Sequence, residues 1–178
     1  MAILGVLAVV VLIAINPVQQ LARTRDTGRK SAVTQVGHAL EAYYTGRGGT
    51  YLTNSNCAAV TSAGGANGWL NCLVTTGELS TAPSAIAYTV GSAVPCTVAS
   101  LVGAEGDRQN NLCYKRATTT NFMTVYARME SNVEISKCPA GSTFAWFVWA
   151  SADGRAGLIC TNSASEPGAG SNGTNYID

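Results

Sequence analysis

The chain opens with an uninterrupted apolar run over residues 1–15, followed by Asn16-Pro17 and a polar stretch. A helix rises about 1.5 Å per residue, so the run covers roughly 22 Å, whereas a bilayer core needs about 30 Å and around 20 residues. A signal peptide also fits badly, because no basic region precedes the run and Ala14-Ile15-Asn16 is a poor cleavage site. We therefore expect that Met1 is not the mature start of the native protein.

Beyond Pro17 the pattern becomes amphipathic. Apolar residues recur at steps of three and four: Val18, Leu21, Ala22, Val33, Val36, Leu40 and Tyr43 or Tyr44. Charged residues take the other positions: Arg23, Arg25, Asp26, Arg29 and Lys30. Glycines after Tyr44 then stop the helix. This pattern predicts one long helix over 1–47, with an apolar half (1–15) and an amphipathic half (18–45), followed by a globular head over 48–178.

The head reads as a loop-rich connection followed by strands. Short helical turns are expected over 57–60 and 69–74, and strands over 85–90, 111–117, 121–130, 143–151 and 156–161. Residues 121–130 alternate in the way that an antiparallel sheet with one buried face requires. Residues 151–154 read as a hairpin turn, and the tail from Asn162 as an exposed segment. A helix followed by an antiparallel meander predicts an α+β fold.

Six cysteines all follow residue 50: Cys57, Cys72, Cys96, Cys113, Cys138 and Cys160. An even number confined to the head indicates three disulfides in an oxidising compartment, and the spacings match no zinc pattern. The alternatives are buried free thiols or a metal cluster. Among the 15 possible connectivities we predict nearest-neighbour pairing, Cys57 with Cys72, Cys96 with Cys113 and Cys138 with Cys160, because short loops close at low entropic cost.

Three segments together resemble the amino-terminal helix and first turn of type IV pilins and type II secretion pseudopilins: AILGVLAVVVLIAINP, QLARTRDTGRKSAVTQV and LEAYYTGRGGTY. The hairpin TFAWFVWASADGRAGLICT resembles the last hairpin of bacterial pilins more loosely. The resemblance implies the pilin fold, a long helix packed on an antiparallel sheet. The family's processing site and its Phe-Thr-Leu-Ile-Glu opening are absent here, as they would be from a sequence that starts eight to ten residues late.

The same resemblance implies that the apolar helix is the element of filament assembly. Small residues would let neighbouring helices approach and larger ones would supply packing area: Ala2, Leu4, Gly5, Ala8, Val10, Leu12 and Ala14. Pro17 removes a backbone donor and should weaken the helix just before it. The implied partners are copies of the same chain, the cytoplasmic membrane before assembly, and the assembly machinery of a pilus or secretion filament.

Catalytic chemistry has no visible position in the sequence. The single histidine, His38, and the nearby Glu41 read as helix surface residues rather than as an acid–base pair. Residues 105–111 could offer oxygen ligands to calcium but read better as a turn. Asn172-Gly173-Thr174 is a weak glycosylation match. We expect no enzyme activity, cofactor or metal.

Composition points the same way. Charged residues make up only 12% of the chain and the net charge is +1, so nucleic acid is a poor candidate partner and a surface of small neutral groups suits packing against copies. The leading hypothesis is therefore a structural subunit of an extracellular filament. The alternative is a membrane-anchored or secreted disulfide-bonded module for binding or adhesion that does not polymerise.

Overall fold

The computed structural model of the chain describes residues 16–53, 56–57, 68–89, 96, 104–117, 120–162, 166–168 and 176–177. Of the predicted assembly residues only Pro17 falls within these ranges. The seven from Ala2 to Ala14 lie outside the described residues, as do Asn172, most of the tail and most of the helical turn expected over 57–60.

The long helix of the described chain is α2, Pro17–Gly46, which covers the predicted amphipathic half. Asn16 caps it by accepting a hydrogen bond from the backbone N–H of Gln19 at 3.4 Å, and a proline at the first helical position fits a site where no donor is needed. Gly48 and Gly49, with φ of 68° and 78°, turn the chain away after its end. No helix within the described ranges is long and apolar enough to cross a membrane.

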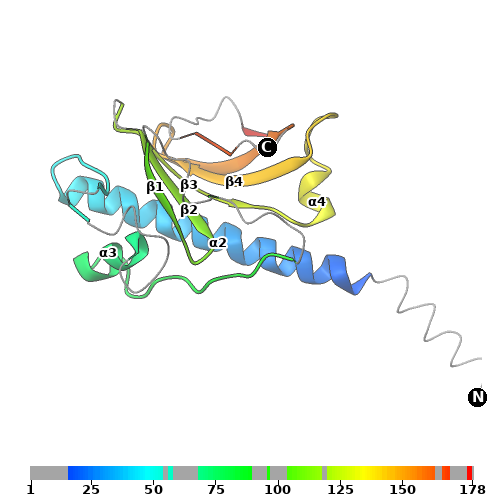
Figure 1. Cartoon of the computed structure of the whole chain (residues 1–178), viewed down its shortest axis with the longest axis horizontal. Helices are drawn as coiled ribbons and strands as arrows, with labels where there is room; N and C mark the ends of the chain where they lie inside the picture. Colours follow the sequence, from blue (N-terminus) through cyan, green and yellow to red (C-terminus); the bar gives the residue numbers. More distant parts are fainter. Residues whose placement is uncertain are drawn as a thin grey trace, which may run out of the picture.

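One antiparallel sheet packs on α2 (Figure 1). Its strands follow chain order: β1 (Ala104–Gln109), β2 (Leu112–Ala117), β3 (Met123–Arg128), β4 (Phe144–Ala150), β5 (Arg155–Thr161) and the short β6 (Tyr176–Ile177). Two short helices accompany them, α3 (Trp69–Thr76), which confirms the turn expected over 69–74, and α4 (Asn132–Ile135). The α+β arrangement of a helix on an antiparallel sheet is therefore present.

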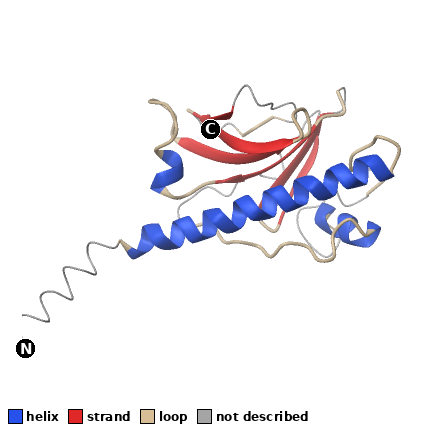
Figure 2. Ribbon diagram, turned by 180° about the vertical axis from the view of Figure 1, so that it is seen from behind, coloured by secondary structure: helices blue, strands red, loops and turns tan. Residues whose placement is uncertain are grey.

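Two predicted elements were wrong. The described part of the strand expected over 85–90 has no regular structure and runs beside α2, on the side away from the sheet in both Figure 1 and Figure 2. The stretch interpreted as a turn, 105–111, forms most of β1, and only Asn110 and Asn111 turn, both with positive φ. Strand β1 was not predicted because it is a polar edge strand. Such strands lack the apolar alternation from which inner strands are predicted.

Both faces of the sheet are buried, whereas the alternation in 121–130 predicted one. Met123, Val125 and Ala127 of β3 join the core beneath α2. Tyr126, on the opposite face, belongs to a second cluster with Cys96 and with residues from the neighbouring strands: Cys113, Trp146, Val148 and Ile159. The outer face is covered because Cys96 and the tail residues 166–168 lie over it.

Three disulfides join nearest neighbours in sequence, which confirms the predicted pairing. Cys57 pairs with Cys72, Cys96 with Cys113 and Cys138 with Cys160, at Cα separations of 6.2, 5.9 and 5.6 Å. These distances lie in the ordinary range for disulfides. The alternative of free thiols is thereby excluded.

Candidate assembly interface

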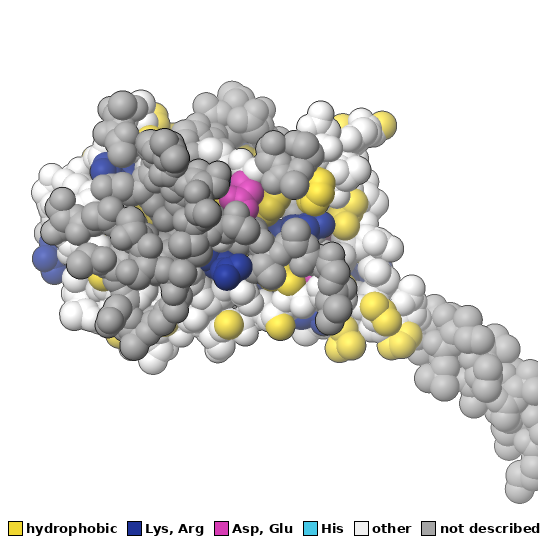
Figure 3. All heavy atoms as spheres, in the orientation of Figure 1, with side chains coloured by type: hydrophobic (Ala, Val, Ile, Leu, Met, Phe, Trp, Pro, Cys, Tyr) yellow, Lys and Arg dark blue, Asp and Glu magenta, His cyan; other side chains and the backbone are white. Residues whose placement is uncertain are grey.

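The described part of α2 begins with exposed apolar side chains. Val18 and Leu21 are each 60% exposed, and Figure 3 shows apolar groups gathered at this end of the helix. The cause lies in the packing, because the helix extends past the sheet at this end (Figures 1 and 2). Sequence periodicity had placed both residues on the stripe that packs on the head, and that interpretation was wrong.

A continuous outward stripe of α2 carries no charge. We define the outward stripe by the exposed residues that recur every three or four positions: Gln20, Thr24, Thr27, Ser31, Gln35, His38, Ala42 and Thr45. Exposed helix positions are usually filled with Lys and Glu, which are good helix formers and keep surfaces soluble. Of the charged side chains of α2, only that of Arg23 is exposed.

The three threonine hydroxyl groups of the outward stripe are already hydrogen-bonded within the helix. Thr24 donates to the carbonyl of Gln20 at 3.1 Å, Thr27 donates to that of Arg23 at 3.0 Å, and Thr45 donates to that of Ala42 at 2.9 Å. Burying a polar group is costly mainly when its hydrogen bonds are lost. Covering the outward stripe with another protein surface therefore costs less desolvation free energy than covering a charged helix face would.

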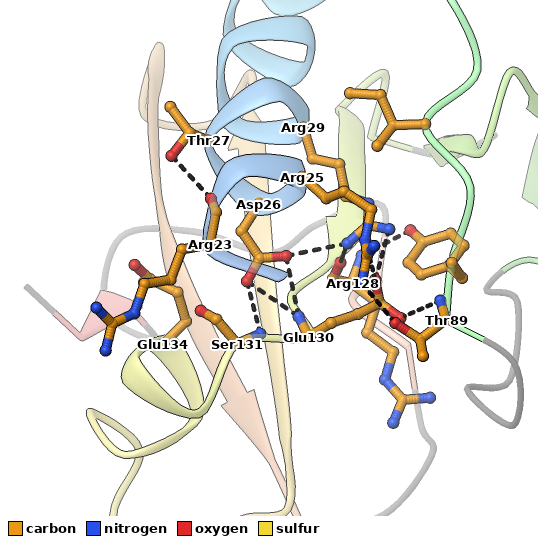
Figure 4. A network of polar contacts seen from close by, with 12 residues as sticks. Arg23, Arg25, Asp26, Thr27, Arg29, Thr89, Arg128, Glu130, Ser131 and Glu134 are labelled. Atoms are coloured by element: carbon orange, nitrogen blue, oxygen red, sulfur yellow. Dashed lines mark hydrogen bonds and ion pairs between the residues drawn. The ribbon is translucent and has the colours of Figure 1, made fainter. Parts of the chain in front are cut away.

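Two charged residues of the first half of α2, Asp26 and Arg29, point into the protein instead. Asp26 is 2% exposed and Arg29 is 1% exposed, and their side chains pair at 3.0 Å. Arg29 also pairs with Glu130 at 2.7 Å, while Asp26 accepts hydrogen bonds from the backbone N–H groups of Glu130 and Ser131 at 3.0 and 2.7 Å. Figure 4 shows the group joining the helix to the chain that follows β3.

The irregular segment 84–89 completes this buried network. The Arg29 guanidinium donates to the carbonyl of Ala87 at 2.8 Å and lies 4.0 Å from the ring centroid of Tyr88. Glu130 accepts a hydrogen bond from the backbone N–H of Thr89 at 2.6 Å, and Arg25 donates to the Thr89 hydroxyl at 2.7 Å. The prediction that the charged residues form the polar outer face of the helix was wrong for Asp26 and Arg29, which are buried with partners in the head, whereas Arg23 is exposed as predicted.

A second ionic contact lies beside the first. Lys30 pairs with Glu134 of α4 at 2.7 Å, and Lys137 pairs with the same carboxylate at 2.9 Å. Burial alone would raise the pKa of Glu134, but the hydrogen bonds from the two lysines outweigh it, and the pKa is lowered. The Lys30 side chain is thus paired within the subunit.

The other residues singled out from the sequence have structural contacts. His38 is exposed, with its ring centroid 4.4 Å from that of Trp149. Glu41, expected to be exposed, is half-buried and accepts hydrogen bonds from the Tyr51 hydroxyl at 3.0 and 2.9 Å. Among the described residues no group of three His, Cys, Asp or Glu side chains could hold a metal ion.

Comparison with protein-family models, with curated proteins and with solved structures gives no match to this chain. The interface is therefore argued from its own geometry. Sequence reasoning missed the outward stripe, although a run of Thr, Ser and Gln at helical spacing without Lys or Glu was a signal that could have revealed it.

Proposed function

We propose that this protein is a structural subunit of an extracellular filament of the type IV pilus or secretion pseudopilus kind, assembled through its amino-terminal helix. The observation that supports this most directly is the arrangement of charge on α2. Apart from the exposed Arg23, its charged groups are paired or hydrogen-bonded within the subunit, and the outward stripe holds no Asp, Glu, Lys or Arg. A free surface gains nothing from such neutrality, whereas a packed one does.

The apolar run before α2 fits the same role. Val18 and Leu21 are exposed apolar side chains that follow closely on the apolar sequence of residues 1–15. Close packing of such helices from several copies would bury both. Before assembly the run would lie in the cytoplasmic membrane, which offers the same apolar surroundings.

The three disulfides support an extracellular location, since such bonds form and persist in oxidising compartments. They also suit a subunit whose head must remain folded outside the cell. The proposed role is structural and requires no catalytic group.

A single charge in the proposed helix bundle tests this function. Val10→Lys should abolish filaments, because an ammonium group among packed apolar helices has neither water nor a partner. Val10→Leu, which keeps the apolar character, is the matched control and should assemble. Negative-stain imaging and sedimentation measure filaments, and circular dichroism should show that the head of both variants is folded.

The same experiment separates this proposal from the alternative of a non-polymerising binding module. In that alternative the helix is only an anchor. Filaments that form unchanged from the Val10→Lys variant, or from a chain lacking residues 1–17, would contradict the assembly role.

A further inference from the structure

Three hydrogen-bond donors converge on the outer face of the sheet, on the side opposite α2. Cys113 of β2 lies opposite Tyr126 of β3, and Lys115 lies opposite Thr124. The disulfide from Cys113 fixes Cys96 above the same face, and Cys96 has a positive φ of 49°. The backbone N–H of Cys96, the Tyr126 hydroxyl and the Lys115 ammonium group therefore surround one point, which we call the donor site.

The chain's own tail fills the donor site with a carboxylate. One oxygen of Glu166 accepts a hydrogen bond from the N–H of Cys96, and the other accepts from the Tyr126 hydroxyl at 2.7 Å and from Lys115 at 3.1 Å. Lys115 also donates to the carbonyl of Pro167 at 3.3 Å. The Thr124 hydroxyl donates to the carbonyl of Gly168 at 3.2 Å. Three successive tail residues are thus recognised as a peptide.

The donor site is selective for a negatively charged group. The described groups that contact the Glu166 carboxylate are all donors, and Tyr126 is fully buried, so loss of the carboxylate would leave the Tyr126 hydroxyl without this acceptor and Lys115 without its anionic partner. Burial alone would raise the pKa of Glu166, but the hydrogen bonds from Tyr126, Cys96 and Lys115 outweigh it and lower that pKa. A neutral side chain of the same shape would accept weaker hydrogen bonds from these donors.

The other described contact of the tail with the sheet is small, since β6 pairs with β5 over two residues. We propose that the outer face of β2 and β3 is a binding site for a peptide that carries a glutamate followed by two backbone carbonyls, and that it takes the tail of a second copy when its own tail is displaced. Each copy presents the required sequence, Glu166-Pro167-Gly168. Copies held side by side offer one another such tails at local concentrations of roughly millimolar order, comparable with a tethered ligand. The inference does not depend on filament formation.

The test uses the full-length protein carrying Glu166→Gln, in which the donor site keeps its groups but loses its carboxylate ligand. The probe is a blocked peptide, NSASEPGAG, identical to residues 162–170. Titration should give saturable changes in the backbone amide NMR signals of Cys96, Lys115 and Tyr126. The wild-type protein should need at least about tenfold more peptide, because its own tail competes.

Two controls decide between the outcomes. The peptide NSASQPGAG should bind at least about tenfold more weakly, and adding Lys115→Met to the Glu166→Gln protein should remove binding of the original peptide. Equal binding of both peptides, or no binding by a natively folded Glu166→Gln protein, would overturn the site. Unlabelled protein carrying Lys115→Met, whose tail is intact, should reproduce the shifts in labelled Glu166→Gln protein. Shifts with the peptide but none with that second copy would overturn exchange between copies.

Discussion

The first half of α2, residues 17–30, buries the charged side chains of Asp26 and Arg29 and exposes apolar ones, whereas the second half, residues 32–46, buries apolar side chains and exposes no Asp, Glu, Lys or Arg. In the first half Asp26 and Arg29 face inward while Val18 and Leu21 face water. In the second half residues such as Val36 and Leu40 are fully buried against the head. The difference follows from what covers each half, since the irregular segment 84–89 offers polar backbone groups to the first and the sheet offers aromatic and aliphatic side chains to the second.

The two halves of α2 therefore have different roles. The second half fixes the helix to the head by apolar burial, which is insensitive to pH and salt. The first half is fixed by ion pairs and leaves its apolar residues free for another surface. Four predictions test the contrast, beginning with the largest effect on the free energy of unfolding.

Removal of Asp26 should be the most damaging change in the first half. Asp26→Ala leaves the buried Arg29 with one carboxylate partner fewer and removes the acceptor for the N–H groups of Glu130 and Ser131. Breaking a buried ion pair from one side costs about 3–5 kcal/mol, and urea denaturation measures it. The exposed Arg23 is the control, because Arg23→Ala should change stability by no more than about 0.5 kcal/mol. Equal losses in the two variants would contradict the buried network.

In the second half the sensitive position is Gly37, which lies directly against Trp149. A Cβ atom there would come within 2.2 Å of the Trp149 ring, so Gly37→Ala should cost about 1–3 kcal/mol through overpacking. Gly46→Ala is the matched control, since the nearest atom to its Cβ would be an oxygen of Glu78 at 3.9 Å. That variant should be stabilised by about 0.4–1 kcal/mol, because alanine restricts the unfolded chain. Thermal denaturation of the Gly37→Ala and Gly46→Ala variants shows whether the effect at Gly37 comes from close packing against Trp149 or from replacing glycine with alanine in general.

Acid should loosen the first half of α2 before the second. The folded-state pKa of Glu134 is lowered, so its pairing with Lys30 and Lys137 stabilises the fold above the ordinary carboxylate pKa and is lost as the pH falls below about 4. Amide hydrogen exchange measured between pH 7 and pH 3, corrected for intrinsic rates, should rise earlier for residues 17–30. In a Lys30→Met variant that difference should be reduced even at neutral pH. Simultaneous loosening of both halves would contradict the prediction.

The smallest effect on stability is expected at the exposed start of the helix. Val18→Lys and Leu21→Lys replace side chains that are mostly exposed, so each should alter the free energy of unfolding by no more than about 0.5 kcal/mol. If this surface packs against other copies, both changes should nevertheless shorten or abolish filaments. Gln20→Lys, on the same turn, tests whether the outward stripe joins that contact. Filaments of normal length from all three variants would restrict assembly to residues outside α2.

The predictable part of this fold rested on strong local signals. Helix α2, α3, the inner strands and the disulfide pairs could all be predicted, because glycines, apolar alternation and short loops between cysteines each act over a few residues. Strand β1 could not, since an edge strand needs no apolar face. The pairing of Asp26 and Arg29 with Glu130 was equally hidden, because it joins residues about a hundred positions apart.

The candidate interface was harder to predict than the fold. Helical periodicity identifies which residues share a face, but it does not say which face lies against the head. Val18 and Leu21 have the spacing of core residues and become exposed only because α2 outruns the sheet. The donor site could not be predicted for a similar reason. It depends on the register of the β2–β3 strand pair, which places Lys115 opposite Thr124.

The order of the disulfides along the chain has a consequence for how the protein matures. Their loops of 15, 17 and 22 residues follow one another without overlap. A chain that enters an oxidising compartment from its amino end presents each cysteine with its proper partner before the next pair arrives. Oxidation can therefore keep pace with translocation, and native pairs can form without an isomerase to correct early mistakes. With interleaved disulfides, cysteines that had already entered the compartment would stay unpaired until their partners arrived.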